Sequence, residues 1–238
     1  MEIIKKKDDK IIFKAKIGES LANAIRRYVG EILVLAVDEV EISKNDSPLY
    51  DETIAHRIGL IPVKTDKEIN VKTEGKLKLS VKGEGKVYSG ELKGNVDVVY
   101  DKIPITILTK NQELELIANI KAGKGEEHAK FYPGLIFYRG VAEITMDKEF
   151  RGEIQKLCPD NEVKEKGDKI IVVDDKEKEI CDVCEGICEK AKKKSETNYR
   201  DELIINIESF GQLDAKNIFK KSISALKKDL AEVSKKIK

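Results

Sequence analysis

Two short apolar-rich stretches open the chain. They cover residues 3–4 and 11–17, and the polar residues 7–10 separate them. Short runs rich in isoleucine are typical of β-strands, and a short polar connection between two such stretches favours a tight turn. The start of the chain therefore predicts a β-hairpin.

The pattern then changes to the spacing of a helix. After Ser20, a candidate N-cap, one helical stripe collects the apolar residues of positions 21–33. Its members are Leu21, Ile25, Tyr28, Val29, Ile32 and Leu33. The opposite face carries Asn23, Arg26, Arg27 and Gly30. A strand is predicted at 34–42, and the turn-forming residues 45–48 indicate a domain edge.

The middle of the chain is dominated by strand patterns. A short helix is expected at 52–60, and Gly59 and Pro62 are expected to end it. From residue 76 to 146 the two-residue alternation predicts an antiparallel sheet, interrupted by glycine- and lysine-rich turns. Residues 150–198 hold all four cysteines and many charges, and we expect too little apolar content there for a separate core.

The last segment predicts a strand at 203–207 and a long helix from residue 212. Its apolar positions are separated by 4, 3, 4, 3 and 4 residues: Phe219, Ile223, Leu226, Leu230, Val233 and Ile237. This average of about 3.5 residues is the seam of two paired helices. The alternative is that the chain's own sheet covers the stripe. Seam spacing that continues almost to the last residue favours a partner helix from another chain, with Leu21 and Ile25 supplying the rest of that interface.

Composition excludes several classes of protein. The chain has 45 basic and 44 acidic residues, so no net charge attracts it to nucleic acid or to an anionic membrane. No apolar run is long enough to span a bilayer, and we expect a cytoplasmic protein. Three of the four cysteines fall within eight residues, which in a reducing compartment favours metal binding over disulfides.

Several motifs together resemble a known family. Residues 21–27 (LANAIRR) and 51–63 (DETIAHRIGLIPV) resemble the two N-terminal signatures of the alpha-type subunits of RNA polymerase. Residues 87–89, 101–105 and especially 128–133 (HAKFYP) are similar to the archaeal branch of that family, the D-type subunits. With the terminal helix, the resemblance extends over essentially the whole chain.

The resemblance implies an α+β fold with a discontinuous dimerisation domain. That domain, with a mixed sheet and two long helices, would be residues 1–46 and 199–238. A β-rich insert domain (47–149) and a small cysteine-containing insert (150–198) would interrupt it. The family pairs with a smaller subunit, L, and the heterodimer then binds small subunits N and P and the two large subunits. Asn23, Arg26 and Arg27 match family positions that contact a large subunit. An ordinary solvated helix face is the alternative for these three residues.

No catalytic site is predicted. Polymerase chemistry needs clustered carboxylates that hold two Mg²⁺ ions, and the adjacent pairs Asp8–Asp9 and Asp174–Asp175 lie in charged runs typical of solvated loops. His56 and His128 have no second ligand at metal spacing, so we expect structural roles for both. The chain is predicted to be a non-catalytic part of a nucleotidyltransferase.

The cysteines leave three alternatives open. Cys158, Cys181, Cys184 and Cys188 provide the four thiolates that a [4Fe–4S] cluster or a zinc ion requires. They resemble the ferredoxin-like insert of some archaeal subunits, but the spacing C-x2-C-x3-C departs from the ferredoxin run, and Lys178 occupies the expected first position. A [4Fe–4S] cluster, zinc, or no metal at all are the possibilities, and we expect a metal to order residues 150–198.

Two other functions compete with the assembly subunit. An iron–sulfur electron carrier would explain the cysteines but not the helix seam. A homodimeric interaction protein would use the same terminal helix. Co-expression with a small partner separates the heterodimer from the homodimer.

Overall fold

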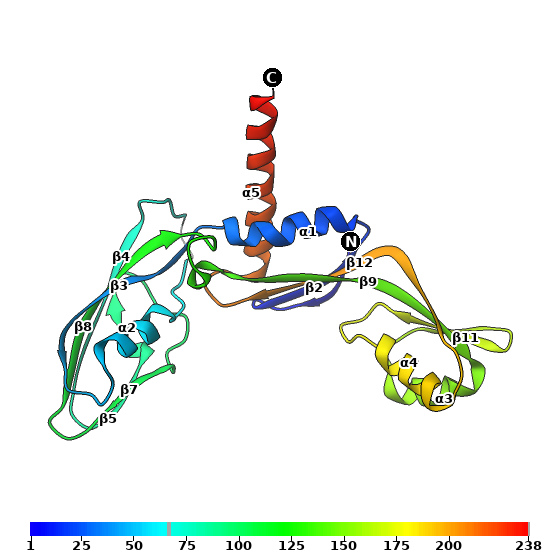
Figure 1. Ribbon diagram of the computed structural model, residues 1–238, viewed down its shortest axis with the longest axis horizontal. Helices are drawn as coiled ribbons and strands as arrows, with labels where there is room; N and C mark the ends of the chain where they lie inside the picture. The colour runs from blue at the N-terminus through cyan, green and yellow to red at the C-terminus, as the bar shows by residue number, and fades with distance from the viewer. Residues whose placement is uncertain (66–67, 238) are drawn as a thin grey trace. The chain divides into compact units, whose positions relative to one another are not determined.

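The structure is a computed structural model that describes residues 1–65 and 68–237 (Figure 1). It has the predicted α+β class, with antiparallel pairing between the strands. Two compact units divide the chain. The first comprises Met1–Ala24 and Ile136–Ile207, and the second Ile25–Leu135 and Glu208–Lys238. These boundaries differ from those of the three predicted segments, which stay a prediction.

A six-stranded sheet forms the first unit, in the order β1-β2-β12-β9-β11-β10. Its strands are β1 (Glu2–Lys6), β2 (Lys10–Ala15), β9 (Gly134–Asp147), β10 (Val163–Lys166), β11 (Lys169–Asp174) and β12 (Glu196–Ser209). The hairpin predicted from the first residues is confirmed, because β1 and β2 pair antiparallel across the turn. Strand β9 belongs to this sheet and pairs with β11. It therefore does not continue the sheet expected over residues 76–146, because its partners come from later in the sequence.

Two helices and a buried cluster complete the cysteine-containing part of the first unit. Helix α3 (Arg151–Leu157) follows a 3₁₀ turn, η4 (Lys148–Phe150), and α4 (Cys181–Lys190) follows β11. The buried side chains that pack together there are Ala142, Ile144, Met146, Phe150, Ile154, Cys158, Ile170, Val172, Ile180, Cys181, Cys184, Ile187 and Cys188. Residues 150–198 share this core with β9 and do not form a separate one, in agreement with the expectation. Strand β9 supplies apolar side chains from outside the segment, and the cysteines themselves act as small apolar residues.

The second unit contains a four-stranded sheet and a two-stranded ribbon. The larger sheet has the order β3-β8-β4-β6 and the ribbon pairs β5 with β7. The strands are β3 (Val34–Asn45), β4 (Glu74–Lys82), β5 (Gly85–Tyr88), β6 (Lys93–Gly94), β7 (Pro104–Leu108) and β8 (Glu113–Gly123). Alternate residues of β4, such as Leu77 and Leu79, are buried while their neighbours are exposed, as a sheet with one covered face requires.

Helix α2 (Asp51–Gly59) covers part of this core and lies where a helix was predicted (Figure 1). Ile54 and Ile58, four residues apart, are fully buried and share one helical face. Acidic residues begin the helix and His56 and Arg57 end it, which suits the helix dipole. The signature segment 51–63 therefore has a structural role in the core of the second unit.

Helix α1 (Glu19–Arg27) is shorter than predicted. A 3₁₀ turn, η1 (Tyr28–Glu31), replaces its expected last turn, so only part of segment 21–33 is α-helical. Gly30 disfavours helix and is needed for packing, because a Cβ there would lie 2.7 Å from the hydroxyl oxygen of Tyr132. The long helix α5 (Ala215–Lys236) begins at Asp214, whose side chain accepts a hydrogen bond of 2.6 Å from the backbone N–H of Asn217. Within the described ranges, none of the helices is at once long and apolar enough to cross a bilayer.

Candidate functional site

The last helix changes from buried to exposed along its length. Its first turns bury Ala215, Ile218, Ser222 and Leu226 within the second unit, where α5 packs against η1. The Tyr28 hydroxyl donates a hydrogen bond of 3.1 Å to Asp229 Oδ2 and joins η1 to the helix. All residues from 227 to 237 are exposed. The helix therefore has an anchored half and a half that its own unit leaves uncovered.

The exposed half continues the predicted seam. Leu230, Val233 and Ile237 are 60%, 52% and 80% exposed, and they follow Leu226 at intervals of four, three and four residues. Of the other predicted interface residues, Leu21 is exposed, Phe219 and Ile223 are half-buried, and Ile25 and Leu226 are buried. Other parts of the same chain therefore cover the side chains of Ile25 and Leu226. A continuous apolar row is left in the last turns of α5.

The polar face of α1 is also at the surface. Asn23, Arg26 and Arg27 are exposed, whereas Ala22 and Ile25 on the other side of the helix are buried. The predicted division into two faces therefore holds for Ile25 and for these three polar residues. It fails for Leu21, which is exposed although it was placed on the apolar stripe, and for Gly30, which is buried although it was placed on the polar face. Contact of these three residues with another subunit stays a prediction.

The cysteines lie on one face of a helix. Cys181, Cys184 and Cys188 are three and four residues apart in α4, so all three point into the same buried cluster, and Cys158 joins it at the end of α3. All four thiols are free and buried. Burial raises the pKa of Cys184 to about 12. In the sequence, the spacing of three and four residues between these cysteines indicates one face of a helix. Comparison with the ferredoxin run alone did not reveal this helix face.

A buried ion pair lies at the start of the same helix. The Asp174 side chain is fully buried, its Oδ1 lies 2.9 Å from a guanidinium nitrogen of Arg139, and its Oδ2 accepts a hydrogen bond of 3.1 Å from Ile180 N–H. The Cys181 thiol also donates to this Oδ2, at 3.3 Å. Burial first, and this hydrogen bond second, raise the pKa of Cys181 to about 12. The prediction that Asp174 lies in a solvated loop is wrong, because the carboxylate fixes the start of α4.

This arrangement does not fit a metal centre. Among residues 1–65 and 68–237, no three His, Cys, Asp or Glu side chains are grouped so that they could hold a metal ion. Seven residues of helix separate Cys181 from Cys188 by about 10.5 Å along the axis. Two thiolates on one zinc ion are at most about 4.6 Å apart, since each Zn–S bond is about 2.3 Å. A carboxylate beside Cys181 also disfavours a thiolate there. The [4Fe–4S] cluster stays a prediction that this placement of the thiols does not favour.

Replacing Cys184 by alanine tests the role of the thiols. We expect the variant to keep an ordered α4 and to lose about 1–2 kcal/mol of stability, because a small buried group leaves a small cavity. Both proteins would be purified anaerobically, and metal content, visible absorbance and amide exchange in residues 181–190 compared. Cys184→Val, which fills the space, is the matched control. Stoichiometric metal in the parent, lost together with the order of α4 in both variants, would contradict the core role.

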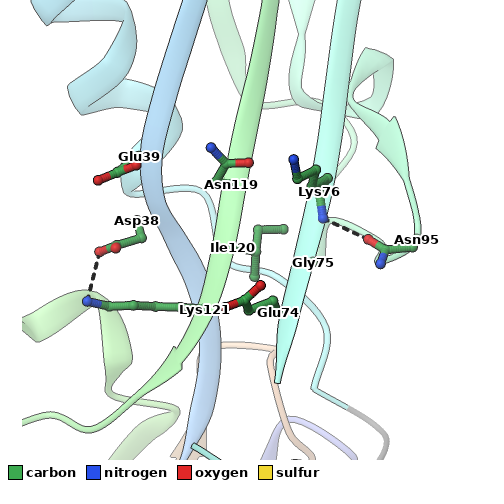
Figure 2. Close-up of a pocket in the computed structure, with 9 residues that line it drawn as sticks. All are labelled: Asp38, Glu39, Glu74, Gly75, Lys76, Asn95, Asn119, Ile120 and Lys121. Carbon is green, nitrogen blue, oxygen red and sulfur yellow. Dashed lines mark hydrogen bonds and ion pairs between the residues drawn. The ribbon is translucent and has the colours of Figure 1, made fainter. Parts of the chain in front are cut away.

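A polar hollow of about 600 Å³ lies on the four-stranded sheet of the second unit. Figure 2 shows its lining on β3, β8 and β4, with Lys121 directed to Asp38 and the Lys76 backbone to Asn95. The Lys121 Nζ to Asp38 Oδ1 distance is 3.1 Å, and Lys76 N–H donates to Asn95 Oδ1 at 2.7 Å. The charges of Lys121 and Asp38 therefore neutralise one another here. The hollow has the character of a solvated sheet face and provides no arrangement of catalytic groups.

Comparisons with known proteins decide the family. Residues 40–136 match the model of the RNA polymerase Rpb3/RpoA insert domain. The chain is 34% identical to DNA-directed RNA polymerase subunit Rpo3 of Archaeoglobus fulgidus over an alignment of 257 positions, which covers 99% of this chain and 96% of that relative. The chain belongs to the archaeal Rpo3 family.

Other Rpo3 proteins are similar over different extents. The Pyrococcus horikoshii subunit is 40% identical, over 64% of this chain and 63% of its own length. The Methanosphaera stadtmanae subunit is 31% identical over 90% of this chain and 89% of its own length. The expected membership of the alpha-type family is confirmed. A β-rich insert is confirmed as well. In this chain the matched segment contains α2 and strands β4 to β8.

Proposed function

We propose that this chain is a non-catalytic assembly subunit of DNA-directed RNA polymerase. Its task is to pair with a smaller subunit, L in the archaeal enzyme, and so to form the platform for small subunits N and P and for the large subunits. The observation that supports this most is the uncovered apolar row Leu230, Val233 and Ile237 on a helix that is anchored only at its start. Membership of the Rpo3 family makes the chain part of a nucleotidyltransferase complex.

Physical reasoning favours a helical partner. Apolar residues at an average spacing of 3.5 suit knobs-into-holes packing, and burial of each such side chain contributes about 1.5–3 kcal/mol. Basic residues such as Lys227, Lys228 and Lys235 lie on the other faces and keep the free helix soluble. Leu21, half exposed at the start of α1, is also open to contact with a partner. Asn23, Arg26 and Arg27 are proposed to contact a large subunit, since planar guanidinium groups suit carboxylates and backbone carbonyls.

Catalysis is assigned to other subunits of the polymerase. Polymerase chemistry uses carboxylates that hold two Mg²⁺ ions across the reacting phosphate. In the polar hollow Asp38 forms an ion pair with Lys121, and the buried Asp174 is engaged with Arg139. This supports a role in assembly. An electron carrier remains the less favoured alternative, because the cysteine thiols pack in the buried cluster beside α4.

Leu230→Asp tests the proposed function. We expect the Kd for the small pairing subunit to rise by about a hundredfold or more, because a charge would enter an apolar seam. The free energy of unfolding of the isolated chain should change by less than about 0.5 kcal/mol, since Leu230 is exposed. Titration calorimetry with the co-purified partner and urea unfolding measure the two quantities.

Ala231→Asp is the matched control, because it adds the same charge about 100° around the helix and should leave pairing nearly unchanged. Size-exclusion chromatography with light scattering distinguishes the rivals. A stable self-dimer that Leu230→Asp dissociates would favour the homodimeric protein. Equal affinities of parent and Leu230→Asp for the small subunit would refute the proposal.

A further inference from the structure

A second, smaller surface of the second unit has the properties of a docking groove. It lies between the start of α2 and the β5–β7 ribbon, and its volume is about 470 Å³. In the ribbon, Lys86 is paired with Ile107 and Tyr88 with Pro104. Lys86 and Tyr88 alternate onto one face of the ribbon, opposite the buried Val87 and Thr106. A register shift between Val87 and Tyr88 lets their partners Ile107 and Pro104, three residues apart, share that face. Ile107 is 55% exposed on that face.

The charges around this groove have one sign. Arg57, Lys86 and Lys102 line it, and among the residues that the structure describes no acidic one does, although the whole chain has nearly equal numbers of acids and bases. All three are exposed. Within the ranges 1–65 and 68–237, none of them forms an ion pair, whereas Lys44, Lys121 and Lys124 elsewhere in the unit do. Ion pairs with the described residues of its own unit therefore do not neutralise the positive charge of the groove.

The guanidinium group of Arg57 is held in place by a backbone carbonyl. One of its terminal nitrogens donates a hydrogen bond of 2.6 Å to the backbone carbonyl of Pro104. A guanidinium has five N–H donors, so this tether fixes the group and leaves further donors for a carboxylate. The helix α2 that carries Arg57 is itself anchored by the buried Ile54 and Ile58. Fixing the cation in advance lowers the entropy that binding would cost.

From these observations we propose that the groove binds an extended, acidic segment of another polymerase subunit, in which aspartate or glutamate stands beside apolar side chains. The carboxylates meet Arg57, Lys86 and Lys102, and the apolar side chains cover Ile107 and Pro104. This inference rests on the proposed function, because it requires the chain to meet other subunits in an assembled polymerase. The contact is separate from the helix seam of α5.

Cross-linking in the assembled enzyme tests this proposal. A photoreactive phenylalanine analogue replaces Ile107 in the full chain, the polymerase is reconstituted from all its subunits, and cross-linked peptides are identified by mass spectrometry. We expect peptides rich in Asp or Glu from one partner subunit. The yield should fall about tenfold in the double variant Lys86→Glu, Lys102→Glu, because two favourable charges become repulsive. The matched control Lys72→Glu, Lys110→Glu changes the same charge at exposed positions that do not line the groove.

The outcomes separate this inference from the proposed function. Assembly with the small pairing subunit is measured in the same samples. Normal assembly with no cross-link, with cross-links only to segments that lack acidic residues, or with a yield that charge reversal leaves unchanged overturns the groove proposal alone. Failure of the parent chain to assemble at all overturns the proposed function and, with it, this inference.

Discussion

Asp174→Ala is expected to destabilise the cysteine-containing part of the first unit by about 3–5 kcal/mol, because breaking a buried ion pair leaves a charge without its partner. Asp174 is fully buried, and its carboxylate contacts Arg139, Ile180 N–H and the Cys181 thiol. After the substitution the Arg139 guanidinium, which is only 18% exposed, loses its counter-charge. Helix α4 also loses the acceptor at its first turn. Amide exchange in residues 180–188 measures the local effect, and urea unfolding measures the global one.

Two variants make this prediction specific. Asp182→Ala removes an exposed carboxylate from the first turn of the same helix and should cost less than about 1 kcal/mol. The double variant Arg139→Met, Asp174→Leu replaces both charges by apolar groups and should recover most of the loss, as for other buried pairs. A loss below about 1 kcal/mol for Asp174→Ala, or no recovery in the double variant, would show that the pair does not fix α4.

Elements with a clear hydrophobic period could be predicted from the sequence. The first hairpin, α2 and the long C-terminal helix depend on local alternation or helical spacing, and all three are present. Helix α1 was predicted too long, because its end depends on Gly30 and Tyr132, which are far apart in the sequence. Local pattern cannot reveal a contact of that kind.

Nonlocal pairing also limited what could be predicted about the candidate sites. Strand β9 looked like part of the insert sheet, but it pairs with β11 and supplies one wall of the cysteine cluster. Asp174 looked solvated because its neighbours in sequence are charged, while Arg139 comes from another strand. In the terminal helix, the spacing of apolar residues was visible, but the sequence did not show that the chain covers the stripe only as far as Leu226.

The second large effect is expected for Phe131→Ala, at about 3–5 kcal/mol of stability in the second unit. Phe131 is 1% exposed and lies in the HAKFYP segment. In that segment His128 Nδ1 accepts a hydrogen bond of 3.0 Å from Lys130 N–H and begins a 3₁₀ turn, η3 (Ala129–Phe131). The Phe131 ring packs over Gly123, where a Cβ would lie only 2.6 Å from ring atom Cζ. Truncating the ring therefore empties a tightly packed site. Urea unfolding with exchange of the β8 amides measures the loss.

The glycine supplies the control for this prediction. Gly123→Ala should destabilise the parent, because the new methyl group collides with the ring, and should destabilise the Phe131→Ala background much less, because the ring is gone. The coupling between the two changes should exceed about 1 kcal/mol, as for residues in direct contact. Independent, additive losses would show that the ring is not seated on Gly123.

A comparison of Phe131→Ala with Leu230→Asp separates support of the pairing helix from contact with the partner. Tyr132, next to Phe131, lies against Gly30 of η1, and η1 packs against α5. A buried Phe131 cannot touch another subunit, so any effect of Phe131→Ala on pairing must act through the stability of this base. We therefore expect the Kd for the small subunit, measured where the variant is fully folded, to stay within about threefold of the parent value. Leu230→Asp should show the opposite behaviour, with stability kept and affinity lost. A large rise in Kd for folded Phe131→Ala would mean that the position of α5, and not only its exposed row, is set by the turn at Phe131.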